Sequence, residues 1–287
     1  MLKKIKLIAA PILIFCLLVL LCGAIKLLGY RSQKLANDMV TVQSKEMESA
    51  GEYQENSINI IIRTKCDSLE LYMSDDTISE LFDIYIDEKA ADFDQTVSID
   101  RNEYTVDYSK TYGDMTVVIN SHADINSIFI DAPAANMNIR NLTLAELALN
   151  TNAGNIVCYD IYSDSIVVSS QNGSVNIKDT ESTVMKISSQ SGKICINSYS
   201  REFYMSTTSG TIEFVPVDID LRADITTESG DIYVRFDEND DVTMYIKQKT
   251  GIIRVSDDYV LNENKYMKGS GYSVINIYTD EGNIIIE

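Results

Sequence analysis

Apolar and polar residues alternate through the C-terminal half of this chain, and the alternation is organised around a recurring glycine. Apolar residues lie two and four positions after the glycine and five and seven positions before it. A period of two within each arm predicts strands that bury one face. The glycines are Gly154, Gly173, Gly192, Gly210, Gly230, Gly251 and Gly282, separated by 19, 19, 18, 20, 21 and 31 residues. Repetition at such a period is typical of a stacked repeat protein.

Two further features of the repeat concern its turn. Ala135 takes the glycine position one repeat earlier. The residue three before each glycine is polar, and mostly small, although the alternation along the strand places its side chain on the buried face. Pairs such as Asn172-Gly173 and Ser191-Gly192 predict turns in which glycine takes a positive φ. The inward polar residues are Thr151, Ser170, Ser189, Thr207, Thr227, Gln248 and Thr279. We expect their hydroxyls to hydrogen-bond to one another along the stack.

Two folds are compatible with this pattern. A parallel β-solenoid, or β-helix, would use each repeat as one rung of about 20 residues, giving about eight rungs with equivalent residues stacked on one another. An antiparallel meander or β-sandwich would use each glycine turn as a hairpin. The sameness of each repeat position favours the all-β parallel solenoid, because a meander needs only alternation.

The chain divides into three segments on composition. Residues 1–34 are expected to be a cytoplasmic tip and a transmembrane signal anchor, and residues 35–56 a polar juxtamembrane stalk. Residues 57–287 form the solenoid, with irregular early strands over 57–120 that cap the stack and regular repeats over 121–287. The early strands are predicted at residues 58–62, 69–71, 84–86, 104–106 and 117–119.

An unbroken apolar run covers residues 7–25 and follows three lysines. It is long enough to cross a bilayer as a helix, and the lysines favour a cytoplasmic N-terminus. The run therefore predicts a single-pass protein of the cell membrane, with the lipid bilayer as a partner and the C-terminal domain outside the cytoplasm. A cleaved signal peptide and lipoprotein cleavage before Cys22 are the alternatives.

The formal net charge of −19 restricts the partners of the chain. Such an acidic surface repels the phosphates of nucleic acid, so we expect no nucleic-acid partner. Solubility and protection of strand edges from aggregation are the plain reasons for the charge. An envelope protein or a glycan is the expected partner, and self-association through one end of the solenoid is a further expectation.

The longest step between glycines, from Gly251 to Gly282, contains an insertion within residues 257–272. Insertions in repeat proteins become surface loops and are often where binding takes place. This segment is therefore the candidate partner-binding loop; the alternative is that it folds over the last rung and shields its edge. The candidate binding residues are Tyr259, Lys265, Tyr266, Lys268 and Tyr272.

Catalytic chemistry is sparse in the sequence. His122 is the single histidine, and no Walker loop, nucleophile elbow or zinc-protease motif is present. The five cysteines lack metal-site spacing; Cys158 has inward parity and Cys195 outward parity. The acidic cluster at residues 237–241 could hold Ca²⁺ or supply Asp240 and Asp241 to a polysaccharide-acting β-helix enzyme, but it also fits a solvated turn. We expect no enzyme activity, no cofactor and no metal.

The turns of the repeat carry a resemblance. The runs Ser191-Gly192-Lys193-Ile194 and Ser229-Gly230-Asp231-Ile232 resemble the array of a bacterial putative-adhesin family of uncharacterised, membrane-anchored β-repeat proteins. The resemblance covers roughly residues 57–287 and carries no catalytic motif. It implies a membrane-anchored β-solenoid outside the cytoplasm, acting as an adhesin-like binding or envelope-associated structural module. The ectodomain of an envelope-stress sensor is a further alternative.

Overall fold

The structure is a computed structural model that describes residues 39–43, 57–74, 81–87, 96–108, 113–217, 220–237 and 240–287. The predicted anchor at residues 1–34 lies outside the described residues, as does most of the predicted stalk. Within the described ranges, no helix has the length and apolar character needed to cross a membrane. Every regular element among them is a strand.

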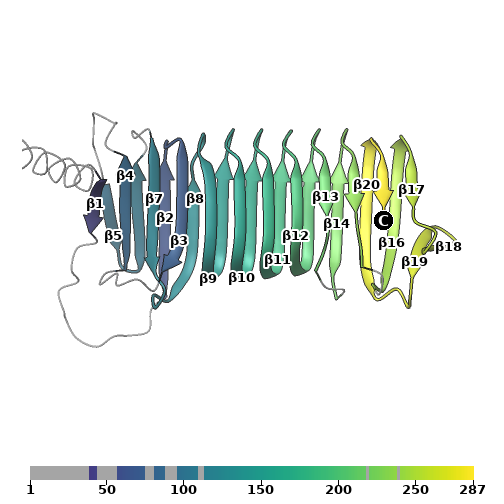
Figure 1. Ribbon diagram of the computed structural model, residues 1–287, viewed down its shortest axis with the longest axis horizontal. Coiled ribbons are helices and arrows are strands. Elements are labelled where there is room, and N and C mark those ends of the chain that lie inside the picture. The colour runs from purple at the N-terminus through teal and green to yellow at the C-terminus, as the bar shows by residue number, and fades with distance from the viewer. Residues whose placement is uncertain are drawn as a thin grey trace, which may run out of the picture.

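The regular repeats stack in parallel, as predicted for a solenoid and not for a meander. The strands are β8 (Ile125–Asp131), β9 (Asn136–Thr151), β10 (Ile156–Ser170), β11 (Val175–Ser189) and β12 (Ile194–Thr207). Residues at the same repeat position pair with one another, as in Ile156 with Val175 and Val175 with Ile194. Each copy of the sequence repeat is therefore one rung, and Figure 1 shows the rungs side by side along the molecule.

The last repeats stack out of sequence order. They contain β13 (Ile212–Phe214), β14 (Arg222–Thr227), β15 (Ile232–Val234), β16 (Val242–Thr250), β17 (Ile253–Val255), β20 (Ser273–Glu281) and β21 (Ile284–Ile286). Strand β20 lies between β14 and β16, and β21 lies between β15 and β17 (Figure 1). The last strand in sequence is therefore not the edge of the stack, because the outermost rung is formed by β16 and β17.

The N-terminal rungs are interleaved in a similar way. Strands β2 (Ile58–Thr64) and β3 (Ser68–Ser74) pair with β8 and β9 on one side. On the other side they pair with β6 (Glu103–Tyr108) and β7 (Asp114–Asn120), which come later in the chain. All five predicted early strands are confirmed by β2, β3, β6, β7 and β4 (Phe82–Asp87).

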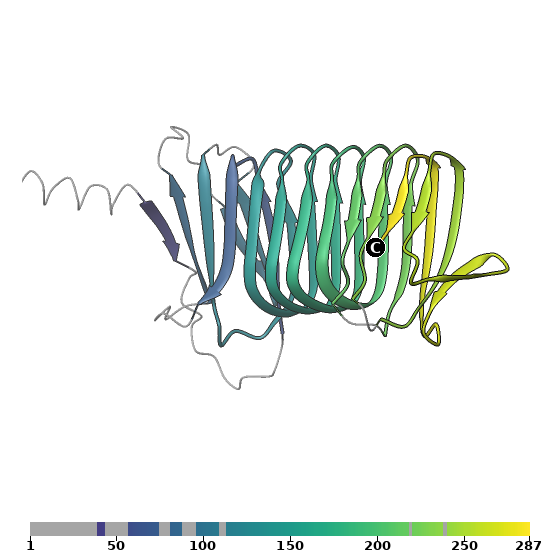
Figure 2. The same cartoon turned by 45° about the vertical axis from the view of Figure 1, so that its right-hand side comes forward.

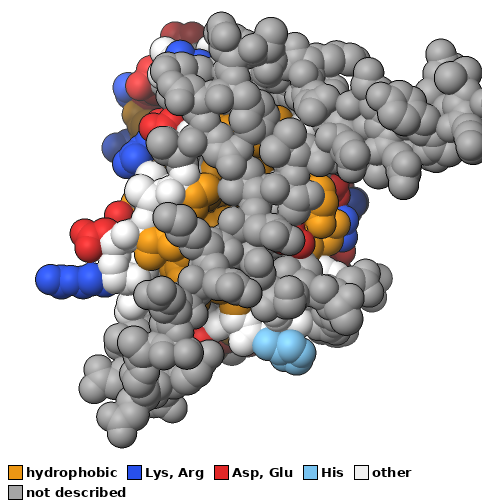
Figure 3. Space-filling view, turned by 90° about the vertical axis from the view of Figure 1, so that its left-hand side faces the viewer, with side chains coloured by type: hydrophobic (Ala, Val, Ile, Leu, Met, Phe, Trp, Pro, Cys, Tyr) orange, Lys and Arg blue, Asp and Glu red, His pale blue; other side chains and the backbone are white. Residues whose placement is uncertain are grey.

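Antiparallel strands cover the N-terminal end. Strand β4 pairs antiparallel with β7, and β5 (Thr96–Asp100), which was not predicted, pairs antiparallel with β6. Strand β1 (Met39–Gln43) comes from the predicted stalk and pairs antiparallel with β4. Seen from this end, hydrophobic side chains lie toward the middle of the stack and charged side chains at its periphery (Figure 3). A reversal of strand direction thus ends the parallel ladder.

The core is a set of apolar columns that run along the stack. The inward apolar positions of the inner rungs are buried, as in the column of Ile156, Val175 and Ile194. The cysteines follow their predicted parity, since Cys158 is buried and Cys195 is partly exposed. Burial raises the pKa of the Cys158 thiol to about 12, which keeps that side chain a neutral apolar filler.

The recurring glycine is required by close approach between rungs. A Cβ at Gly192 would overlap the carbonyl oxygen of Gly173, and the same relation holds from one glycine to the next along the column. Among these glycines only Gly251 and Gly282 have φ in the left-handed region, at 123° and 156°. The prediction that a positive φ explains the glycine is therefore wrong for the other rungs, where the limiting factor is space.

The inward hydroxyls accept hydrogen bonds from amides of their own rung rather than bonding to one another, which corrects the expected ladder, although Thr207 and Thr279 also donate at 3.4 Å to carbonyls of the neighbouring rung. The amide of Gly173 donates to Ser170 Oγ at 2.9 Å, and the amide of Gly192 donates to Ser189 Oγ at 2.8 Å. Thr151 and Thr207 accept the equivalent bonds from Gly154 and Gly210 at 3.1 and 2.9 Å. Each hydroxyl thus satisfies a turn amide that the tight corner leaves without a strand partner.

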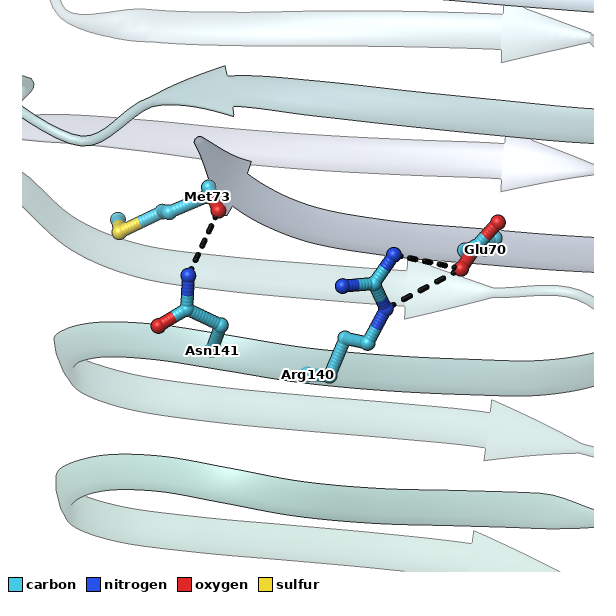
Figure 4. Close-up of polar contacts among 4 residues, drawn as sticks. All are labelled: Glu70, Met73, Arg140 and Asn141. Carbon is cyan, nitrogen blue, oxygen red and sulfur yellow. Dashed lines mark hydrogen bonds and ion pairs between the residues drawn. The ribbon is translucent and has the colours of Figure 1, made fainter. Parts of the chain in front are cut away.

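A second corner lies opposite the glycine corner. Asn141, Asp160 and Asp179 occupy it on successive rungs with φ of 51°, 56° and 47°, a conformation that Asn and Asp tolerate better than most residues. At this corner Asn141 Nδ2 donates to the Met73 carbonyl at 2.8 Å, and Arg140 Nη2 pairs with Glu70 at 3.0 Å (Figure 4). These contacts fasten the regular rungs to strand β3.

Candidate functional site

The predicted partner-binding loop forms a β-hairpin at the C-terminal end. Its strands are β18 (Val260–Asn262) and β19 (Lys265–Lys268), and it projects from the stack (Figure 2). Strand β19 also pairs antiparallel with residues Val242 to Met244 of β16. The hairpin therefore covers part of the outermost strand, and the same insertion returns the chain to the inner position of β20.

The five predicted loop residues have different environments. Tyr259 is buried against Phe236, with ring centroids 6.4 Å apart, and Lys268 Nζ lies 5.5 Å from the Tyr259 ring. Lys268 also donates to the carbonyl of Asp237 at 3.1 Å. Tyr266 and Lys265 are half-buried in β19, whereas Tyr272 is 67% exposed. The structure thus does not gather these side chains into one surface.

The acidic cluster contributes an anchor for this insertion. Asp241 accepts hydrogen bonds from the Ser270 hydroxyl and from the Gly271 amide, and Thr243 Oγ1 donates to the Gly271 carbonyl at 3.0 Å. The Ser270 hydrogen bond, followed by the backbone amides, lowers the pKa of the Asp241 carboxyl below its ordinary value of 3.8. No group of three or more metal-ligating side chains occurs in the part of the chain that the structure describes.

Replacing Asp241 with asparagine should loosen the turn at residues 268–272 at neutral pH. A carboxyl with a lowered pKa stabilises the folded state above its ordinary pKa and loses that effect as the pH falls through the lowered value. In the parent protein, protection of this turn from hydrogen exchange, taken relative to the intrinsic rate at each pH, should therefore fall only below about pH 3.8. In Asp241→Asn this protection should already be lower at pH 7 and should change little on acidification, whereas in Asp257→Asn, which changes an exposed aspartate outside the turn, it should match the parent. An acid response that survives in Asp241→Asn would contradict this account.

A shallow trough on the outer face of the stack is the second candidate site. Its volume is about 430 Å³. It lies beside the glycine corner and crosses five adjacent rungs, from β10 to β20. Its lining residues are Ser170, Ser188, Ser189, Gln190, Ser206, Thr207, Thr208, Thr226, Thr227, Glu228 and Tyr278. Hydroxyl side chains dominate, Glu228 is its acidic residue, and none of the lining residues is basic.

The rim of the trough follows one outward column of the sheet. Ser188 pairs with Ser206, Ser206 with Thr226, and Thr226 with Tyr278. Ser188 and Thr226 donate only long hydrogen bonds of 3.5 Å to carbonyls of the neighbouring rung. Each hydroxyl keeps lone pairs that can accept a hydrogen bond from a ligand.

One buried hydroxyl in the trough departs from the series. Thr227 is 2% exposed, and its Oγ1 has no hydrogen-bond partner within the described ranges. The equivalent hydroxyls of Thr151, Ser170, Ser189 and Thr207 all accept from a glycine amide. A buried polar atom without a partner costs free energy, so this rung is less well satisfied at its corner than its neighbours are.

The C-terminal end of the trough is held by a polar network. The Tyr278 hydroxyl donates to Asp280, and Lys249 Nζ pairs with the same carboxylate at 2.7 Å. This ion pair lowers the pKa of Asp280 and raises that of Lys249. Lys247 Nζ lies 5.7 Å from the Tyr278 ring centroid. The half-buried ring is therefore fixed in place at the end of the hydroxyl column.

Sequence reasoning did not find this trough, although a signal was available. The position four before each glycine is outward, and it holds Ser169, Ser188, Ser206 and Thr226 on four successive repeats. Only the inward hydroxyls were considered in the sequence, and this outward column was not. That Tyr278 ends the column could not be predicted, because it follows from the insertion of β20 beside β14.

The fold and these surfaces define an all-β protein with a largely parallel sheet. The sequence profile of the Toastrack DUF4097 family matches residues 39–287. The chain therefore belongs to that family, a domain of unknown function, which confirms the resemblance to the putative-adhesin proteins. A comparison with curated proteins gave no match.

Two of the solved structures to which this chain is similar are named as putative adhesins. A "putative adhesin" from Bacteroides fragilis NCTC 9343 is 14% identical, with a TM-score of 0.51, and the match covers 87% of this chain and 97% of that one. One from Parabacteroides merdae ATCC 43184 is 14% identical over 87% and 95% of the two chains, with a TM-score of 0.48. The first of these supports the all-β, largely parallel fold.

Proposed function

We propose that this protein is a non-catalytic, adhesin-like binding module that presents the stacked rungs at the outside of the cell membrane. The trough supports this proposal, because it is a concave surface on a paired sheet and is lined by the exposed hydroxyls of Ser188, Ser206 and Thr226. The apolar run at residues 7–25 supports attachment to the membrane. Protection of the C-terminal domain from protease added to intact cells would contradict this orientation.

The proposal places the ligand in the trough rather than on the hairpin. Tyr259 and Lys268 already contact other parts of the protein, so they have less freedom to recognise a partner. The trough residues at the outward positions are exposed and lie on strands that are paired on both sides. A site on such rigid strands loses little conformational entropy when it binds.

Filling the trough should abolish binding without unfolding the protein. Thr226 is exposed on β14, so Thr226→Tyr should place a ring in the trough and weaken capture of cell-envelope fragments from the source organism at least about tenfold. Tyrosine suits an exposed strand position, so stability should change little. The measurement is co-sedimentation of the full-length, detergent-solubilised chain with the fragments.

Thr143→Tyr is the matched control, because Thr143 is also an exposed threonine on a parallel strand but does not line the trough. It should bind like the parent. Equal capture by all three proteins would remove the trough from the proposed function.

A further inference from the structure

We infer that the trough binds a neutral, linear, β-1,4-linked glycan whose chain runs parallel to the stack. This inference rests on the proposed function and names its ligand class. The lining supplies hydroxyls, the Gln190 amide and the Tyr278 ring, which match the hydroxyls and the apolar faces of sugar rings. No lining residue is basic and Glu228 is present; of the two lysines beside the Tyr278 ring, Lys249 is paired with Asp280, and the net charge of −19 opposes a polyanion.

The spacing of the lining groups favours a glycan over a peptide. Groups on the trough recur with each rung, at the strand spacing of about 4.8 Å. A β-1,4-linked chain turns alternate sugars over, so its repeat is a pair of sugars, and we expect this to match about two rungs, or roughly 9.6 Å. An extended peptide repeats every two residues, at about 6.8 Å, and falls out of phase with the rungs.

The strand pairing also excludes the usual way of binding an extended peptide. Strands β12, β14 and β20 each have a neighbour on both sides, so they offer no free edge for an added strand. Recognition must therefore use side chains that point outward from the sheet face. The column from Ser188 to Thr226 provides such side chains on three adjacent rungs.

The Tyr278 end of the trough is the part expected to discriminate between ligands. The ring is held by its hydroxyl on Asp280, so a sugar can stack on it with little loss of side-chain freedom. Thr226 pairs with Tyr278 and precedes Thr227, the residue with the unpartnered buried hydroxyl. A glycan hydroxyl beside the ring can hydrogen-bond to the exposed Thr226 hydroxyl, directly or through one water.

Binding of defined oligosaccharides to the full-length detergent-solubilised chain tests this inference. The probes are β-1,4-linked oligomers of N-acetylglucosamine and of glucose, two to eight sugars long, with polygalacturonate as the anionic comparison. Affinity for at least one neutral series should rise with length until the trough is filled, and polygalacturonate should not bind. Failure of both neutral series, or preferred binding of polygalacturonate, would overturn the inference.

Variants at Tyr278 separate stacking from general damage. Tyr278→Ala should weaken oligosaccharide binding at least tenfold, whereas Tyr278→Phe should stay within about threefold because it keeps the ring. Tyr204→Ala is the control, since Tyr204 is exposed on β12 but does not line the trough. Equal effects of the three changes would contradict a stacking role.

The envelope assay distinguishes this inference from the proposed function. Periodate cleaves the vicinal diols of sugars, so treatment of the fragments should abolish capture, whereas protease treatment should not. Capture that is blocked by Thr226→Tyr, survives periodate and is lost after protease would overturn the glycan and leave the proposed function standing. Capture that Thr226→Tyr does not change would refute the proposed function itself.

Discussion

Replacing Gly192 with alanine should lower the free energy of unfolding by about 3 kcal/mol or more. The added Cβ would overlap the carbonyl oxygen of Gly173 and press against Ser189 Oγ. Both neighbours belong to the tight corner, and the oxygen is part of the backbone, so neither can move aside easily. Relief requires the two rungs to separate, which breaks the parallel ladder between β11 and β12.

Urea denaturation followed by circular dichroism measures this effect, and hydrogen exchange locates it. Repeat proteins can unfold in parts, so exchange in β11 and β12 should respond more than exchange in β2 and β3. Ser191→Ala is the control, because Ser191 is exposed in the same turn and its hydroxyl donates only to surface groups, Asn172 Oδ1 at 2.9 Å and the Gln171 carbonyl at 3.4 Å. It should change stability by less than about 0.5 kcal/mol. Similar losses of stability in the two variants would contradict the explanation that a Cβ at Gly192 overlaps the Gly173 carbonyl oxygen.

Ile284→Ala should destabilise the C-terminal end of the stack by roughly 3 kcal/mol, whereas Ile253→Ala should cost less than about 1 kcal/mol. The two isoleucines occupy the same repeat position and pair with each other. Ile284 is fully buried between two rungs, but Ile253 is 39% exposed on the outermost strand. If the rungs stacked in chain order, the last residue in sequence would be the exposed one and the ranking would be reversed.

The midpoint of urea unfolding for each single variant checks this ranking. Limited proteolysis adds a second readout, because loss of packing at Ile284 should expose β16 and β17, which lie outside β20 and β21. A larger loss for Ile253→Ala than for Ile284→Ala would show that the final rung is not interposed.

Several elements were predictable because their cause is local in sequence. Alternation of apolar and polar residues located the strands, including β2, β3, β4, β6 and β7 in the irregular region. Sameness at each repeat position predicted parallel stacking, because a parallel ladder places equivalent residues such as Ile156 and Val175 beside each other. Strand β5 was missed, and its residues pair antiparallel with β6 rather than with a rung of the repeat.

The candidate sites depended more on contacts between distant residues. The insertion at residues 257–272 was evident from the spacing of the glycines. That it returns the chain to a place between β14 and β16, which both precede it in the sequence, was not evident. Tyr259 looked available in the sequence and is buried against Phe236. The trough needs Ser188, Thr226 and Tyr278 on adjacent rungs, and Tyr278 reaches that place only through the altered stacking order.

The sequence by itself determined the repeat strands and most of the early ones, the buried face of each strand, the corner glycine and the parallel class of the sheet. These follow from two periods in the sequence: a period of two residues within each strand, and a period of about twenty residues between successive repeats. Only the tertiary structure decided the order of the rungs at both ends and the reason for the glycine. Equivalent repeats present nearly equivalent edges, so pairing chemistry alone does not choose among neighbours. The length and anchoring of the connecting segments make that choice, and the close approach of Gly173 to Gly192 exists only once the rungs are stacked.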